Sequence, residues 1–312
     1  MDYSNNHFSV LKKECIDSLE IKPDGIYVDV TLGRGGHSSE ILKKLSNKGI
    51  LISLDQDNDA IEFCKNKFKD YSNIKIIKAN FRDLKKVLNE LNIEKVDGIL
   101  ADLGVSSPQL DNSSRGFSYK NVGVLDMRMN QEQKLDAKEI LNKYSFEKLC
   151  KIFREYGDIK QPKNLVNKII NYRNKKEIET TLEFYDLIKS SLPVKQIYQG
   201  KNFANNYFQS IRIEVNDEIN ALKELLESLD DIMNIEAVAC FISFHSLEDK
   251  IINARFKELS RNTIPKEIPV QMNNANFKII KPKGILPTDI ELDLNNRSRS
   301  AKLRVLKKIK NL

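Results

Sequence analysis

A glycine-broken apolar run near the N-terminus limits the fold of this chain more than any other stretch. Residues 25–37 read GIYVDVTLGRGGH, a β-branched apolar run that breaks into three glycines within four positions. An amphipathic pattern follows, with Ile41, Leu42 and Leu45 on one helical face. A strand, a glycine turn and a helix in succession are typical of an α/β sheet that holds a ligand at a helix N-terminus. We expect glycine there because a Cβ would keep the backbone away from the ligand.

Two further predicted strands end in acids. Residues 50–55 form an apolar run that ends in Asp55, and residues 96–102 form another that ends in Asp102. With Asp29 in the first strand, these carboxylates would line one rim of a parallel sheet, where doubly wound folds bind their ligands. An acid at the tip of the second strand typically accepts hydrogen bonds from ribose hydroxyls.

The turn itself narrows the choice of ligand. A dinucleotide fingerprint would need glycine at Ser38, and the phosphate-loop pattern is absent. An acid two residues before Thr31, followed by G-x-G-G, resembles the adenosylmethionine-binding turn of class I methyltransferases. In such enzymes the residues after the third strand flank the adenine, so Phe81 is a candidate for contact with that ring. The alternatives are a ligand-free turn and a core position for Phe81.

Composition sets broader limits. The 312 residues are 40% hydrophobic and 30% charged, which is typical of a soluble globular protein. No apolar run approaches the roughly 18 residues of a membrane helix, and no secretory signal is recognisable. The four cysteines lack a C-x-x-C spacing, which argues against zinc or disulfides and favours the cytoplasm. A net charge of +7 suits a polyanionic partner, although solvated surface lysine explains it equally well.

The stretch that follows Asp102 carries a second signal. Methyltransferases that act on exocyclic amines have an acid, Asn or Ser, then Pro-Pro-aromatic, just after the fourth strand. Ser106, Ser107, Pro108 and Gln109 are similar, with one proline and no aromatic residue. A conjugated amine is a poor nucleophile, so acceptors must draw it towards tetrahedral geometry and take its proton. Asp102, Ser106, Ser107 and Pro108 are therefore the candidate catalytic residues of an amine-acceptor loop, unless the stretch is only a polar turn.

Helical patterns replace strand patterns between residues 111 and 207. We predict helices at 137–143, 146–156, 163–173 and 182–190, the last with a capping box from Thr180 to Glu183. So long a helical stretch predicts a subdomain inserted into an α/β core made of residues 1–110 and 208–312. After it we expect one long helix over 209–229, a fifth strand over 237–244 and a final strand pair over 277–280 and 301–306.

Several side chains outside the rim are candidates for contact with a nucleic acid. Arg115, Phe117 and Arg128 mix charge with aromatic and Met neighbours at the entrance to the insert, which suits an unstacked base or else a domain hinge. His245 follows the fifth strand, where it would contact substrate or make a structural hydrogen bond. Arg297 and Arg299 lie in a basic tail that would bind phosphates or stay solvated.

Taken together, these motifs resemble one family, the bacterial 16S ribosomal RNA (cytosine-N4) methyltransferases. The resemblance spans nearly the whole chain. The matching residues are His7, Val10, Leu11, 23–27, 31–38, 102–111, 115–118, 125–129, Phe208, Gln209, Arg212, Ile213, Val215, Asn216, Glu218, 243–249 and 297–304. Tyr207 and Val124 depart from it, where the family usually has threonine and proline.

The resemblance implies a class I, Rossmann-like methyltransferase core with an all-helical substrate-recognition subdomain. By it, S-adenosyl-L-methionine would contact Gly35, Gly36, His37, Asp55, Phe81, Asp102 and Gln109. It also implies N4 methylation of a decoding-centre cytidine in 16S ribosomal RNA or the small subunit, and often a homodimer; we predict no metal site. The alternatives are an RNA-binding assembly factor that keeps a cofactor pocket, and an amine methyltransferase for DNA or a small molecule.

Overall fold

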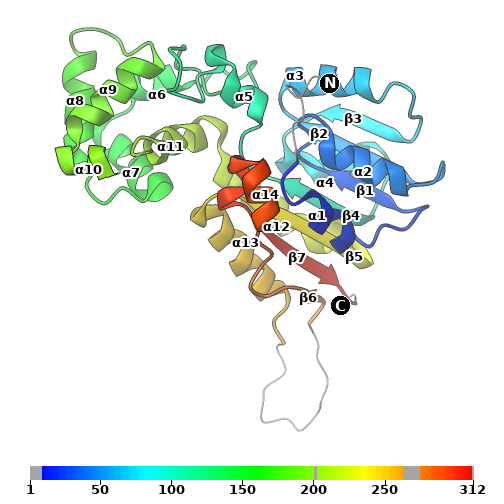
Figure 1. Ribbon diagram of the computed structural model, residues 1–312. Helices are drawn as coiled ribbons and strands as arrows, with labels where there is room; N and C mark the ends of the chain where they lie inside the picture. The colour runs from blue at the N-terminus through cyan, green and yellow to red at the C-terminus, as the bar shows by residue number, and fades with distance from the viewer. Residues whose placement is uncertain (1–8, 200–201, 263–274, 311–312) are drawn as a thin grey trace, which may run out of the picture. The chain divides into compact units, whose positions relative to one another are not determined.

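The computed structural model describes residues 9–199, 202–262 and 275–310 (Figure 1). They form two compact units, one made of the residues up to Gly104 and from Asn220 onward, the other of Val105–Ile219. Residues 105–110 and 208–219, which the sequence analysis assigns to the core, belong to the second unit. His7, part of the family resemblance, lies outside the described residues.

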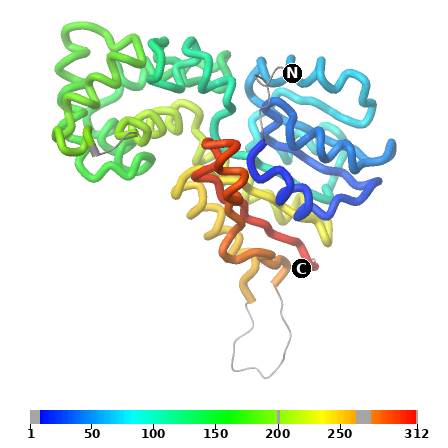
Figure 2. Tube along the Cα trace, in the orientation of Figure 1, coloured from blue at the N-terminus to red at the C-terminus, as the bar shows by residue number. Residues whose placement is uncertain are grey.

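The first unit is built on a seven-stranded mixed sheet in the order β3-β2-β1-β4-β5-β7-β6. The first five strands in this order run parallel, and β7 is antiparallel to both of its neighbours. The predicted α/β class and the final strand pair are thereby confirmed. The strands are β1 (Ile26–Asp29), β2 (Ile50–Asp55), β3 (Ile74–Lys78), β4 (Val96–Asp102), β5 (Met233–Ser243), β6 (Phe277–Ile279) and β7 (Lys302–Lys308). The first and last parts of the chain, blue and red, both contribute to this unit (Figure 2).

Alternation along the strands fills two hydrophobic layers, one on each face of the sheet. On β1, Tyr27 belongs to the layer with α1, α2 and α3, while Val28 belongs to the layer with α4, α12 and α13. A parallel sheet needs both faces covered, which is why its strands are apolar throughout. The helices of this unit are α1 (Lys12–Ser18), α2 (Gly36–Lys44), α3 (Asn58–Lys67), α4 (Leu84–Glu90), α13 (Ser246–Leu259) and α14 (Asp289–Leu294), with most of α12 (Glu218–Ile232). Short 3₁₀ helices lie at η2 (Phe81–Asp83) and η4 (Asn296–Ser300).

The second unit is helical and has its own hydrophobic core. Ile140, Phe153 and Phe184, from three different helices, are completely buried in it. Its elements are α5 (Ser107–Asp111), η3 (Ser113–Arg115), α6 (Ala137–Lys143), α7 (Phe146–Gly157), α8 (Lys163–Arg173), α9 (Thr181–Ser191), α10 (Val194–Gln199) and α11 (Asn205–Asn216). Thr180 and Glu183 form the predicted capping box of α9. Its described residues contain no strand, only an isolated bridge between Val124 and Thr180.

The single long helix predicted over 209–229 is wrong. The chain forms α11 and α12, separated at Asp217, which has a left-handed backbone with φ 49°. The apolar spacing continues through the break, so periodicity alone does not reveal it. Specific contacts lie on either side of Asp217: Asn216 hydrogen-bonds to Met127 and Met129, and Glu218 accepts two hydrogen bonds from Arg212. No helix within the described ranges combines the length and the apolarity needed to cross a membrane.

Candidate active site

The carboxyl ends of β2, β1 and β4 lie side by side at the centre of the sheet, because β1 pairs with both of the others. They carry Asp55, Asp29 and Asp102 respectively. The strand order reverses between β1 and β4, and a doubly wound sheet binds its ligand at such a switch point. The structure thus brings together the three acids that the sequence places on one rim, but it gives each a different environment.

Asp29 belongs to the interior of the turn. Its side chain is 1% exposed, and its Oδ2 accepts a hydrogen bond of 2.7 Å from the Ser38 hydroxyl. Its Oδ1 accepts from the Thr31 N–H at 3.1 Å. Burial raises the pKa of the Asp29 carboxyl to about 6, although these hydrogen bonds lower it. The expectation that this acid faces a ligand is therefore corrected: Asp29 joins β1 to the first turn of α2.

Asp55 holds the turn from the second strand. Its Oδ2 accepts from the Gly33 N–H at 2.8 Å, and its Oδ1 accepts from the Asp57 N–H at 2.9 Å. Burial raises the pKa of this carboxyl to about 6, against the lowering effect of the two backbone hydrogen bonds. Each carboxylate oxygen has a second lone pair, so Asp55 can still accept hydrogen bonds from a ligand.

The glycines of the turn serve packing within the protein. A Cβ on Gly35 would lie 2.6 Å from the Phe68 ring, and one on Gly36 would overlap the Ser9 hydroxyl. Gly35 also has φ 67°, which L side chains adopt rarely. We expected the approach of a ligand to require these glycines; the structure shows that Phe68, at the end of α3, and Ser9, before α1, need the space.

His37 and Asp102 face each other above the turn. His37 Nε2 lies 3.1 Å from the Val10 carbonyl oxygen, and its Nδ1 lies 3.7 Å from Asp102 Oδ2. Because a carbonyl only accepts, Nε2 must carry the hydrogen. Burial lowers the pKa of His37 to about 4, so the ring is neutral near pH 7 and Nδ1 presents a lone pair.

Asp102 is the least satisfied acid of the rim. Its Oδ1 is buried without a hydrogen-bond partner among the described residues. Burial raises the pKa of its carboxyl well above the usual value, and the negative charges of Asp29, Glu248 and Glu291 add to this rise. Orphaned buried acceptors are rare and costly, so this oxygen needs a donor that the described chain does not supply.

Phe81 lies directly after β3 in η2 and is partly buried against the core layer that contains α4. This position agrees with the alternative that Phe81 is a core residue. The side chain is only partly buried, so part of it remains accessible.

The predicted amine-acceptor loop forms the start of α5, in the helical unit. Ser106 is the N-cap, and its N–H donates to Gln109 Oε1 at 2.9 Å within a capping box. Gln109, predicted to contact a cofactor, is therefore buried and engaged with its own helix. Pro108 occupies the first turn, where its missing N–H costs nothing. Ser107 is partly exposed, and no hydrogen bond of its hydroxyl is found among the described residues.

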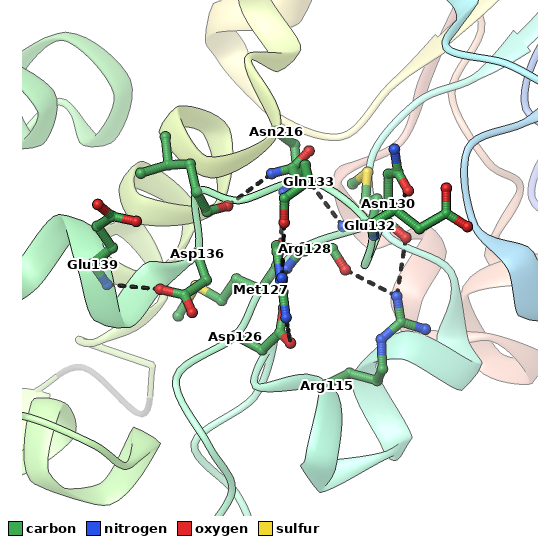
Figure 3. Close-up of polar contacts among 12 residues, drawn as sticks. Arg115, Asp126, Met127, Arg128, Asn130, Glu132, Gln133, Asp136, Glu139 and Asn216 are labelled. Atoms are coloured by element: carbon green, nitrogen blue, oxygen red, sulfur yellow. Dashed lines mark hydrogen bonds and ion pairs between the residues drawn. The ribbon is translucent and has the colours of Figure 1, made fainter.

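Arg115 and Arg128 both hydrogen-bond within the loop that follows Asp126 (Figure 3). Arg115 is 3% exposed and donates to the Arg128 and Met129 carbonyls at 2.9 and 3.2 Å. Arg128 forms a two-pronged ion pair with Asp126 and donates to the Gln133 carbonyl. Phe117 is buried in the helical core. Arg115 and Phe117 are therefore buried within the unit and do not form the exposed surface that the sequence predicts, whereas Arg128 is partly exposed and its contact with a nucleic acid stays a prediction.

Asn216, at the end of α11, completes this loop and was not singled out by sequence reasoning as a site residue. Its Oδ1 accepts from the Met129 N–H and its Nδ2 donates to the Met127 carbonyl, each at 2.8 Å (Figure 3). Met127 is fully buried and left-handed, with φ 59°. The signal in the sequence was the family resemblance, which includes Val215, Asn216 and Glu218.

His245 makes contacts within the protein, whereas the two candidate arginines of the tail are exposed. His245 caps α13, accepting from the Glu248 N–H and lying 3.0 Å from the Glu248 carboxylate through Nε2, which gives it the structural role. Arg297 and Arg299 are both exposed on η4. Lys302 and Arg304, from the same basic tail, instead pair with Asp249. Within the described ranges, no group of three or more metal-ligating side chains could hold an ion.

This geometry defines a doubly wound α/β protein with an acceptor-rich rim at its switch point. Within that class, residues 4–309 match the MraW methylase family, and the chain belongs to this family of methyltransferases. Ribosomal RNA small subunit methyltransferase H of Ureaplasma urealyticum is 51% identical over 304 residues, covering 97% of this chain and 98% of that protein. The protein of the same name in Malacoplasma penetrans is 49% identical over 306 residues, 98% of each chain. Among solved structures, an rRNA methylase from Streptococcus thermophilus aligns with a TM-score of 0.43 and 10% identity over 96% of this chain and 94% of that one.

Proposed function

We propose that this methyltransferase uses S-adenosylmethionine to methylate N4 of a decoding-centre cytidine in 16S ribosomal RNA. The relatives' printed names support the ribosomal substrate, and the motifs after the fourth strand support an exocyclic amine as the target. On this proposal the protein works in the cytoplasm, where bacterial ribosomes are, and the homodimer implied by the resemblance can be tested by sedimentation.

The observation that carries the proposal is the unpartnered Oδ1 of Asp102. The neutral His37 ring, whose Nδ1 lies 3.7 Å from the other carboxylate oxygen, Oδ2, offers a second acceptor, the Nδ1 lone pair. Two acceptors and no donor suit a cationic group with several N–H bonds, such as the ammonium of a methionine moiety. Asp55 offers its remaining lone pairs to a ribose diol. The residues present therefore fit the cofactor.

The bound cofactor would supply a methyl group on a positively charged sulfur. The task of the protein is then to place the target amine in line with that methyl and to accept the amine's hydrogen bonds. Ser107 is the best candidate acceptor in α5, since the Ser106 side chain and Gln109 Oε1 already accept the hydrogen bonds of the capping box. The cytidine must leave any base stack to reach such a site.

The decisive experiment is incubation of the protein with labelled S-adenosylmethionine and small subunits that lack the modification. We expect label on one cytidine of 16S ribosomal RNA, located by mass spectrometry of nuclease fragments. Binding to RNA or subunits without transfer of label would instead indicate an assembly factor. Transfer to DNA or to a small amine, and not to subunits, would support a different methyltransferase.

Asp55→Ala tests the proposed contact with ribose. The substitution removes the acceptor for the diol and also the partner of the Gly33 N–H, so we expect the affinity for S-adenosylmethionine to fall by about a hundredfold. Calorimetry measures it, with Asp59→Ala on α3 as the matched control. An unchanged dissociation constant would refute the ribose assignment.

A further inference from the structure

A single peptide unit connects α14 to the rim. The N–H of Leu11 donates to Glu291 Oε1 at 2.8 Å, across 280 positions of sequence. The carbonyl of the same peptide, that of Val10, lies 3.1 Å from His37 Nε2. In a trans peptide these two groups point in opposite directions, so Glu291 and His37 hold the unit from its two sides. Blue and red segments meet here in the first unit (Figure 2).

The backbone conformation and burial of Leu11 restrict where its N–H can point. Leu11 precedes α1 and has a left-handed backbone, φ 50° and ψ 32°, which is strained for a residue with a Cβ. Its side chain is fully buried, so the backbone around it has little freedom. The Thr288 hydroxyl caps α14 by accepting from the Glu291 N–H, which fixes the base of the glutamate side chain. The acceptor that keeps the Leu11 N–H satisfied is therefore itself well placed.

The state of His37 decides what Asp102 can bind. With its hydrogen on Nε2, the imidazole donates no hydrogen bond to Asp102, so the carboxylate has no donor from His37. With its hydrogen on Nδ1, the ring would direct an N–H towards Asp102 Oδ2, which lies 3.7 Å away, and would compete with a cationic ligand for the same carboxylate. The hydrogen bond of one ring nitrogen selects the tautomer seen by the other.

We propose that Glu291 is a positioning residue of the cofactor site. By holding the Val10–Leu11 peptide it keeps the Val10 carbonyl on His37 Nε2, and so keeps Asp102 available to a cationic ligand. The inference rests on the proposed function for the identity of that ligand. The predicted Nε2–H tautomer of His37 does not depend on the ligand and is present in the free protein.

Three substitutions at one position separate contact from charge. Glu291→Gln keeps an acceptor oxygen at the same reach, Glu291→Asp keeps the charge but is one methylene shorter, and Glu291→Ala keeps neither. Asp293→Ala, in the same short helix, removes an exposed carboxylate and is the matched control. We expect the affinity for S-adenosylmethionine to fall about tenfold in the Ala and Asp variants and by less than about twofold in the Gln and control variants.

The readout that a merely structural role would not move is the tautomer of His37. The chain has three histidines, so ¹⁵N spectra of the imidazole rings in the free protein can be assigned with a His37→Gln variant. We expect the Nε2–H form in the wild type and in Glu291→Gln, and a mixture in Glu291→Ala and Glu291→Asp. Calorimetry and these spectra together test the proposal.

Two results would overturn it: an Nε2–H ring and wild-type affinity in Glu291→Ala, or an equal loss in the Gln and Ala variants. A wild-type protein that does not bind S-adenosylmethionine would refute the proposed function instead. In that case the tautomers would still test the contact between Glu291 and the peptide.

Discussion

Three aspartates at neighbouring strand ends show how far a residue's role depends on its partners. Asp29 is enclosed by Thr31 and Ser38, Asp55 is half committed to backbone N–H groups, and Asp102 has a buried oxygen with no partner among the described residues. The sequence predicts the position of all three, because strands and their ends can be recognised from apolar runs. It does not distinguish among them, because the distinguishing donors come from other segments.

Replacing Asp29 by asparagine should reveal the cost of its burial. Its pKa of about 6 lies above the value of 3.8 in an exposed chain, so the folded state keeps a proton that the unfolded state loses between these values. In the wild type, the contribution of the Asp29 proton to the free energy of unfolding is fully present below pH 3.8. It is lost as the pH rises through 6, which lowers the free energy of unfolding by about 3 kcal/mol. The asparagine side chain would not titrate, so the free energy of unfolding should shift in favour of the variant by about that amount from low to neutral pH.

Urea unfolding at several pH values between about 4 and 8 measures the difference between variant and wild type. Asp70→Asn makes the same chemical change at an exposed carboxyl and is the matched control. A difference for Asp29→Asn that does not vary with pH would show that burial does not perturb this carboxyl.

Ser107→Ala tests the amine-acceptor role within α5. The hydroxyl makes no hydrogen bond among the described residues, so its loss should leave stability nearly unchanged while kcat falls by about tenfold to a hundredfold. The affinity for S-adenosylmethionine should not change, because the acceptor acts on the substrate amine. Single-turnover methylation of subunits gives the rate, with Ser190→Ala, also exposed and helical, as the control. A full rate in Ser107→Ala would assign the acceptor elsewhere.

At the scale of elements, local patterns predicted most helices and strands within a residue or two. The helices α6 and α8 begin and end where the sequence places them, since apolar spacing and capping signals agree there. The break at Asp217 was missed because the apolar face of α11 and α12 is continuous. The partners of two arginines were also missed: only the fold supplies the carbonyls that bind the buried Arg115 and the carboxylate that pairs with the partly exposed Arg128.

Asn216→Ala should loosen the loop that these arginines stabilise. The change leaves the Met129 N–H and the Met127 carbonyl buried without their partner, and Met127 is already in a strained conformation. Two unsatisfied buried groups predict a loss of about 2–4 kcal/mol in the free energy of unfolding. Urea unfolding measures it, and Asn171→Ala on the exposed side of α8 provides the comparison. Equal stability of the two variants would mean that the loop holds its shape without Asn216.

For the whole molecule, the sequence predicts the order of the elements and their division into two units better than it predicts which residues each side chain contacts. Two separate hydrophobic cores, one around the sheet and one among the helices, follow from a change in apolar period near residue 111. The candidate cofactor residues fall in both units: the glycine turn, Asp55 and Asp102 in the first, Gln109 in the second. The contacts that tune them, such as that of Leu11 with Glu291, join distant parts of the chain and leave no local pattern.

The net charge of +7 is a property of the whole chain, and Arg299 tests whether it serves the binding of RNA. Arg299 is exposed and forms no ion pair among the described residues, whereas Arg304 of the same tail is already paired with Asp249. If Arg299 neutralises one phosphate, Arg299→Gln should reduce the slope of log affinity against log salt concentration by about 0.7. Fluorescence anisotropy with a labelled fragment of 16S ribosomal RNA gives the slope. Lys86→Gln, which removes the same charge from the exposed face of α4, should leave the slope unchanged. Equal slopes for Arg299→Gln and wild type would show that this part of the tail is solvated and does not contact RNA.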